Sequence, residues 1–115
     1  MAVVKKAEVP LQESRPGLQS RKLIYEDVGS ASVTIGELIL KPGAILPPHK
    51  HLAEEAFYTL EGSGQATVGE ETFDVEPETA LLAPAGVPHG FKNSGEVPWR
   101  MLYIYPVIQP KAEFV

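Results

Sequence analysis

Histidine and glutamate side chains, both common metal ligands, gather within a short stretch in the middle of this sequence. The chain has three histidines, and two of them stand in the tripeptide His49-Lys50-His51. Residues i and i+2 of a β-strand project from the same face, so the two imidazoles would converge on one point. Glu55 keeps this parity if the strand resumes two residues after the pair, whereas Glu54 would face the other way. We therefore expect a metal site with nitrogen and oxygen ligands, and a solvated surface pair of histidines is the alternative.

Short strands separated by turns must position these side chains. Ten glycines and eleven prolines among 115 residues indicate many turns and few long helices. Gly69-Glu70 suits a two-residue hairpin turn, because glycine tolerates a positive φ. No segment is both long and periodic at 3.6 residues, so the pattern predicts an all-β sandwich or barrel. The strand-like runs are 22–28, 31–41, 45–51, 54–61, 65–69, 71–75, 79–82, 89–92 and 99–107.

The length and composition favour one folded domain. Of the 115 residues, 43% are apolar and 22% are charged, which is an ordinary globular balance. We interpret residues 1–20, which contain Pro10, Pro16 and Gly17, as an N-terminal arm, and residues 21–115 as the domain. Cysteine is absent, which excludes disulfides and thiolate-based metal sites.

Charge and hydropathy narrow the expected partners. The formal net charge of −5 argues against nucleic-acid binding, where a basic stripe would be expected. No stretch approaches the length of a transmembrane helix, so we expect no membrane partner. The first residues lack the apolar core of a signal peptide, and we expect a cytoplasmic protein.

Turn residues and metal-binding side chains recur at fixed intervals in two segments. The first segment runs Gly43, five residues, His49-x-His51, three residues, Glu55, six residues and Gly62. The second begins at Glu78, after fifteen residues, and continues with Pro84-x-Gly86, two residues, His89, three residues and Asn93. Together they resemble the two sequence motifs of the cupin family. The second motif of cupins normally opens with a glycine, where this chain has Glu78. This departure affects the expected backbone conformation of a turn, but it changes none of the expected metal ligands.

The resemblance to cupins implies a fold and a set of ligands. The implied fold is a small antiparallel β-barrel of the jelly-roll type, with one metal ion inside its mouth. His49, His51 and Glu55 match the ligands of the first motif, and His89 matches the ligand of the second. Three imidazoles and one carboxylate suit a divalent transition metal: manganese, iron, cobalt, nickel, copper or zinc. Asn93 is expected to hydrogen-bond a neighbouring loop.

An open metal site favours chemistry on a small molecule or its capture. If the ion is six-coordinate, four protein ligands leave two positions for water, dioxygen or a substrate. The resemblance implies a metal-dependent enzyme that acts on a small oxygenated substrate, of the dioxygenase, decarboxylase or isomerase type. The alternatives are a small-molecule binding or sensor module without turnover and a domain that the metal merely stabilises.

Turnover would require a proton-transfer group beyond the ligands. The candidate acid–base groups and a candidate clamp for a carboxylate are Tyr25, Glu37, Tyr58, Tyr103 and Tyr105, and Arg100. For each tyrosine, the alternative is packing in the sheet with its hydroxyl at the rim.

The last strand-like run places different side chains on its two faces. Arg100 lies on one face, and the opposite face would line an aromatic pocket or pack against a second chain. That opposite face consists of Trp99, Met101, Tyr103 and Tyr105.

We also expect a homodimer. The run Leu38-Ile39-Leu40 is apolar on both faces, which is typical of a strand that is covered on both sides. Residues 1–20 carry aliphatic side chains that a solvated tail would rarely have. The predicted contact therefore uses the N-terminal arm and the outer face of residues 31–41. The alternative is an arm that folds back on its own barrel.

Overall fold

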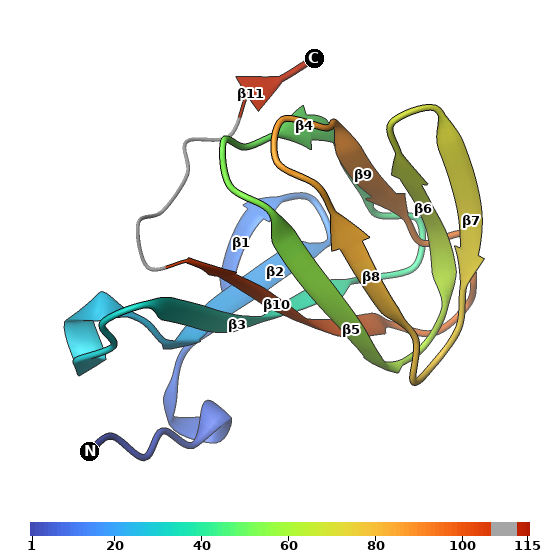
Figure 1. Ribbon diagram of the computed structural model, residues 1–115. Helices are drawn as coiled ribbons and strands as arrows, with labels where there is room; N and C mark the ends of the chain where they lie inside the picture. The colour runs from blue at the N-terminus through green and yellow to red at the C-terminus, as the bar shows by residue number, and fades with distance from the viewer. Residues whose placement is uncertain (107–112) are drawn as a thin grey trace.

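The protein folds into two antiparallel β-sheets that lie face to face (Figure 1). The computed structural model describes residues 1–106 and 113–115. Sheet A consists, in spatial order, of β1 (Gln12–Arg15), β2 (Leu18–Ile24), β3 (Val33–Leu40), β10 (Trp99–Pro106), β5 (Glu55–Glu61) and β8 (Ala80–Ala83). Sheet B consists of β11 (Glu113–Phe114), β4 (Ile45–Lys50), β9 (His89–Lys92), β6 (Gly64–Val68) and β7 (Glu71–Val75). The predicted all-β fold of the jelly-roll type is confirmed.

Helix is confined to two short 3-10 turns in the described residues, η1 (Lys6–Glu8) and η2 (Glu26–Val28). Within that same part of the chain, no helix is long and apolar enough to span a membrane. The last predicted strand, 99–107, is β10, and its residue 107 lies outside the described residues.

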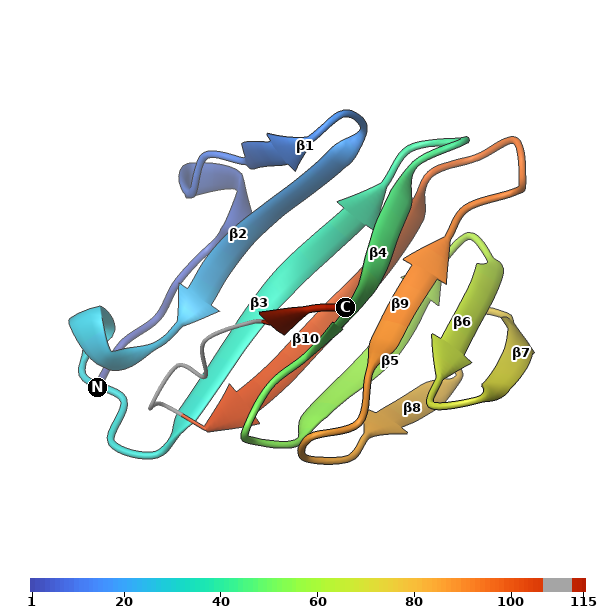
Figure 2. The same cartoon turned by 90° about the horizontal axis from the view of Figure 1, so that it is seen from above.

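The N-terminal residues add a hairpin to the edge of sheet A that the sequence did not predict. Figure 2 shows β1 and β2 beside β3 at this edge. Gly17 makes the tight connection with a φ of +76°, a conformation that costs glycine little. β2 crosses the predicted boundary at residue 20, and the division into residues 1–20 and 21–115 stays a prediction.

The core lies between the sheets and is rich in aromatic rings. Phe91 of β9 packs edge-on against Phe57 of β5 and Trp99 of β10, with ring centroids 4.8 and 5.4 Å apart. The indole nitrogen of Trp99 donates to Thr59 Oγ1 at 3.0 Å, so this buried polar atom is satisfied. The inward-facing Trp99 and Met101 of β10 therefore belong to the core rather than to a contact with a second chain.

Two loop residues of the motifs have clear backbone roles. The buried Asn93 side chain donates to the carbonyl oxygens of Leu40 and Val97, both at 2.9 Å, which confirms its predicted structural role. Glu78 has a φ of +63° and is the one non-glycine residue with positive φ among the described residues. Glutamate thus occupies a turn conformation that favours glycine.

Candidate metal centre

Four potential metal ligands converge at one end of the space between the sheets. We call His49, His51, Glu55 and His89 the ligand group, because their donor atoms all lie within 4.8 Å of one another. His49 on β4 and His89 on β9 are cross-strand partners, and Glu55 begins β5. The neighbouring Glu54 is exposed, as the strand parity predicted. Sheet pairing thus brings together residues that are up to forty positions apart in the chain.

The imidazoles are oriented by the backbone and by the carboxylate. His49 Nδ1 lies 2.9 Å from the carbonyl oxygen of Pro47, which turns its Nε2 away from that carbonyl. His89 Nδ1 similarly lies 3.5 Å from the carbonyl oxygen of Val87. The Nε2 atoms of His51 and His89 are each 3.3 Å from Glu55 Oε1. Outer partners of this kind fix the tautomer and the ring orientation of metal-bound histidines.

The ligand group contains buried polar atoms that the protein leaves unsatisfied. Among the described residues, these are His51 Nδ1 and His89 Nε2. His89 Nε2 is near Glu55 Oε1 but is not aligned for a hydrogen bond. An unsatisfied buried polar atom costs about 1–3 kcal/mol, which a bound ion can offset by coordination. The donor set and these orphaned nitrogens fit one divalent metal ion.

The protonation states of the group also suit a metal. Burial lowers the pKa of His49 more than its hydrogen bond to the Pro47 carbonyl raises it, so the imidazole favours its neutral form. Burial raises the pKa of Glu55, but the close contacts and charges of His51 and His89 outweigh this effect and hold the pKa below its ordinary value. Neutral imidazole and ionised carboxylate are the forms that coordinate.

The ligand group opens onto a cavity of about 610 Å³, which is a size typical of small-molecule sites. Glu55, His49 and His51 form part of its wall. Apolar side chains share this wall with the ligand group. These apolar lining residues include Leu18, Leu38, Leu46 and Phe57.

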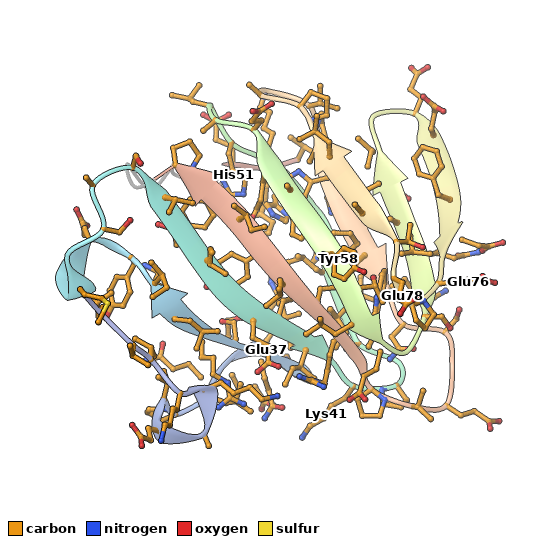
Figure 3. All side chains as sticks on the ribbon, turned by 60° about the horizontal axis from the view of Figure 1, so that its bottom comes forward. Glu37, Lys41, His51, Tyr58, Glu76 and Glu78 are labelled. Carbon is orange, nitrogen blue, oxygen red and sulfur yellow. The ribbon has the colours of Figure 1, made fainter. Side chains whose placement is uncertain are left out.

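Three of the candidate acid–base tyrosines face this cavity and one does not. Tyr103 and Tyr105 of β10, together with Tyr25, line its wall. The inner face of β10 therefore lines an aromatic pocket beyond the core residues. Tyr58 is 37% exposed on the opposite face of sheet A, away from the ligand group (Figure 3).

Glu37 and Arg100 also lie on the outer face of sheet A. Glu37 is only 1% exposed, and its carboxylate accepts hydrogen bonds from Arg21 Nε at 2.9 Å and Arg100 Nη2 at 2.8 Å. Lys6 Nζ lies 3.4 Å from the same carboxylate. Burial by itself raises the pKa of Glu37. The hydrogen bonds and positive charges of Arg100, Lys6 and Arg21 lower the pKa by more, so it lies below its ordinary value. Glu37 points away from the His51 side of the molecule, so neither it nor Arg100 faces the cavity (Figure 3).

Several cavity residues were missed by the sequence reasoning. Lys22, Ser20 and Gln12 come from the β1–β2 hairpin, and Val9 and Pro10 come from the segment before it. Residues 18–24 do not alternate between apolar and polar side chains, so their pattern did not reveal the inward face of β2. No local signal indicates that the hairpin adds to this edge of the sheet.

Comparisons with known proteins agree with this architecture. The family profile described as "Cupin domain" matches residues 36–105. The chain is 30% identical to "Polyketide synthase CurC" of Streptomyces cyaneus over 110 residues, 95% of this chain and 71% of that protein. It is 31% identical to "Tetracenomycin polyketide synthase protein TcmJ" of Streptomyces glaucescens over 101 residues, 86% of this chain and 68% of that protein. The structure of the polyketide cyclase RemF from Streptomyces resistomycificus superimposes with a TM-score of 0.89 and 30% identity, and the match covers 100% of this chain and 85% of RemF.

Proposed function

The chain belongs to the cupin family, and we propose that it is a metal-dependent enzyme acting on a small oxygenated substrate. The observation that carries the proposal is the opening of the ligand group onto a cavity of about 610 Å³. A metal that served only to staple the fold would not need such access. His49, His51, Glu55 and His89 would hold the ion.

The residues around the ligand group have separable tasks in this proposal. A bound divalent ion would supply Lewis acidity toward a substrate oxygen. The carbonyls of Pro47 and Val87 keep His49 and His89 in orientation. Phe57 and the leucines beside it limit the access of water, and Tyr103 and Tyr105 offer hydroxyls for proton transfer.

Three of the relatives narrow the proposed substrate class. CurC and TcmJ are named as polyketide synthase proteins, and RemF is described as a polyketide cyclase. We therefore propose an oxygen-rich carbon skeleton of the polyketide type for this chain. The reaction type, whether dioxygenase, decarboxylase or isomerase, is left to the experiment.

Metal analysis followed by turnover assays tests the proposal. Protein purified without chelators should contain about one equivalent of a transition metal, and His89→Ala should lower this content. Metal-loaded protein should convert polyketide-type substrates, and oxygen consumption by an iron-loaded sample would identify a dioxygenase. A ligand that binds tightly and returns unchanged would favour the binding or sensor module. Metal-free protein from several preparations, with no uptake on dialysis against metal, would refute the proposal.

We also propose a cytoplasmic homodimer, with the outer face of sheet A as its contact. Half-buried or exposed apolar side chains from β3, β10, β5 and β8 share this face, and they include Ile39, Leu102, Leu60 and Leu82. The N-terminal segment instead contacts its own chain, because Arg21 Nη1 donates hydrogen bonds to the backbone carbonyls of Lys6 and Val9. This contact corresponds to the alternative in which the arm folds back on its own barrel. Light scattering should give a dimeric mass, and Leu102→Asp should give a monomer. A monomeric wild-type protein at micromolar concentration would contradict the dimer.

A further inference from the structure

A row of three residues crosses the inner face of sheet A at the cavity. Lys22 on β2 pairs with Gly36 on β3, and Gly36 pairs with Tyr103 on β10. A β-carbon at Gly36 would collide with Cζ and the hydroxyl oxygen of Tyr103. The missing side chain therefore lets the Tyr103 ring lie across β3, with its hydroxyl directed toward the Lys22 side.

Tyr105 presents a second phenol beside the first. The rings of Tyr103 and Tyr105 are stacked, with centroids 5.7 Å apart and planes inclined by only 8°. This arrangement follows from their i and i+2 positions on one face of β10. Within the described part of the chain, neither hydroxyl has a hydrogen-bond partner, although both rings line the cavity. Two adjacent phenol hydroxyls of the cavity wall are thus available to a ligand.

These hydroxyls are donors at neutral pH. Burial, with a smaller effect of the Glu55 charge, raises the pKa of Tyr105 to about 12. Burial also raises the pKa of Tyr103. A protonated phenol in such surroundings donates its hydrogen bond to an anionic oxygen in preference to a neutral one.

Lys22 contributes positive charge at the same end of the cavity. Its Nζ lies 5.5 Å from the centroid of the Tyr25 ring, and both residues line the wall. The other basic lining residue, Arg21, has its guanidinium on Glu37 and on backbone carbonyls at the outer face. Lys22 stands in register with Tyr103 across Gly36, so it adds a basic side chain to the part of the wall that carries the phenols.

We infer that Tyr103, Tyr105 and Lys22 form a second binding point, which holds an oxyanion of the substrate. This inference rests on the proposed function, because it places the oxyanion across the cavity from a metal-facing oxygen. β10 separates β3, over which Tyr103 lies, from β5, which carries Glu55. The substrate class is consequently a difunctional one: a flat skeleton with one oxygen for the metal and a phenolate, enolate or carboxylate at its other end.

Matched hydroxamates test this second binding point. Benzohydroxamate supplies a metal-binding head on a flat ring, and its para-carboxy and para-hydroxy derivatives add a carboxylate or a phenol. Binding to zinc-loaded full-length protein would be measured by calorimetry. At least one derivative should bind about tenfold more tightly than benzohydroxamate itself, which is the effect of one hydrogen bond to a charged group. The derivative that gains more distinguishes a carboxylate from a phenolate.

Variants assign the gain to the named residues. Tyr103→Phe, Tyr105→Phe and Lys22→Met should each reduce the gain, measured as the ratio of the derivative's affinity to that of benzohydroxamate in the same variant, and should leave zinc content unchanged. Gly36→Ala should reduce the gain as well, although Tyr103 keeps its hydroxyl, because the ring is displaced. Tyr58→Phe, on the outer face, is the matched control and should retain the full gain.

The outcomes distinguish failure of the second binding point from failure of the proposed metal-dependent function. If benzohydroxamate binds and neither derivative gains affinity, the second binding point is refuted and the metal site stands. A gain that survives all three variants would equally refute the assignment. If zinc-loaded protein does not bind benzohydroxamate, the open metal site is refuted and this inference falls with it.

Discussion

Replacing Glu37 by glutamine should destabilise the fold strongly without emptying the metal site. The carboxylate is 1% exposed and contacts Arg21, Arg100 and Lys6 at 2.9, 2.8 and 3.4 Å. Glutamine keeps the shape and one carbonyl acceptor but removes the negative charge that these cations share. The variant therefore leaves positive charge at a partly buried site without its counterion.

The expected loss of stability depends on how much hydration or ion pairing each cation regains in the variant. Breaking a buried ion pair costs about 3–5 kcal/mol. The Arg21 side chain is 13% exposed and recovers little hydration, whereas Lys6 is 50% exposed and rehydrates readily. Arg100 keeps a contact of 3.1 Å with Glu61. We expect the free energy of unfolding to fall by about 2–3 kcal/mol at pH 7, which is less than a fully buried pair would lose because Lys6 and Arg100 recover part of their interactions.

Urea unfolding with a matched control measures this loss. Glu61→Gln removes the other carboxylate that contacts Arg100, but Glu61 is 60% exposed, so its loss should stay below about 0.5 kcal/mol. Because the folded-state pKa of Glu37 is lowered, its contribution is full above about pH 4.5 and is lost as the pH falls through that lowered pKa. The difference between wild type and Glu37→Gln should therefore shrink in acid. Equal losses for both variants at pH 7, or metal loss in Glu37→Gln alone, would refute the reasoning.

Three further predictions concern the ligand group and one turn. Glu55→Gln should reduce metal content several-fold by elemental analysis, and Glu54→Gln should leave it unchanged; the reverse result would contradict the strand parity. Because the pKa of His49 is lowered by burial, the metal-free protein should lose stability as the pH falls below about 6.5, and pH-independent thermal melting between 7 and 5 would contradict this. Glu78→Gly should raise the free energy of unfolding by about 0.5–1 kcal/mol, because glycine adopts the positive φ of this turn at less cost. The control Glu76→Gly should lower the free energy of unfolding, and scanning calorimetry would contradict the prediction if both variants were less stable than wild type.

The sequence was sufficient to predict the fold class and the four side chains that converge in the structure. The two-residue period of a strand was enough to place His49 and His51 together and to select Glu55 over Glu54, because side chains alternate strictly between faces. The resemblance of the two motifs to those of cupins implied His89 and the jelly-roll fold. The parity of the ligands and the fold class could be predicted because they depend on neighbours within one strand or on a recurring pattern of turn residues.

Which face of each strand turned inward was decided only by the tertiary structure. The sequence placed Tyr103 and Arg100 on opposite faces of one strand, but only the packing of β10 between β3 and β5 directs Tyr103 into the cavity. Glu37 was a candidate for catalysis until the fold placed Arg21 and Arg100 around it on the outer face. Sequence parity describes a relation between neighbours along one chain segment. Which face is buried depends on residues more than sixty positions away, such as Arg100 for Glu37. These residues come close together only once the strands of sheet A have paired.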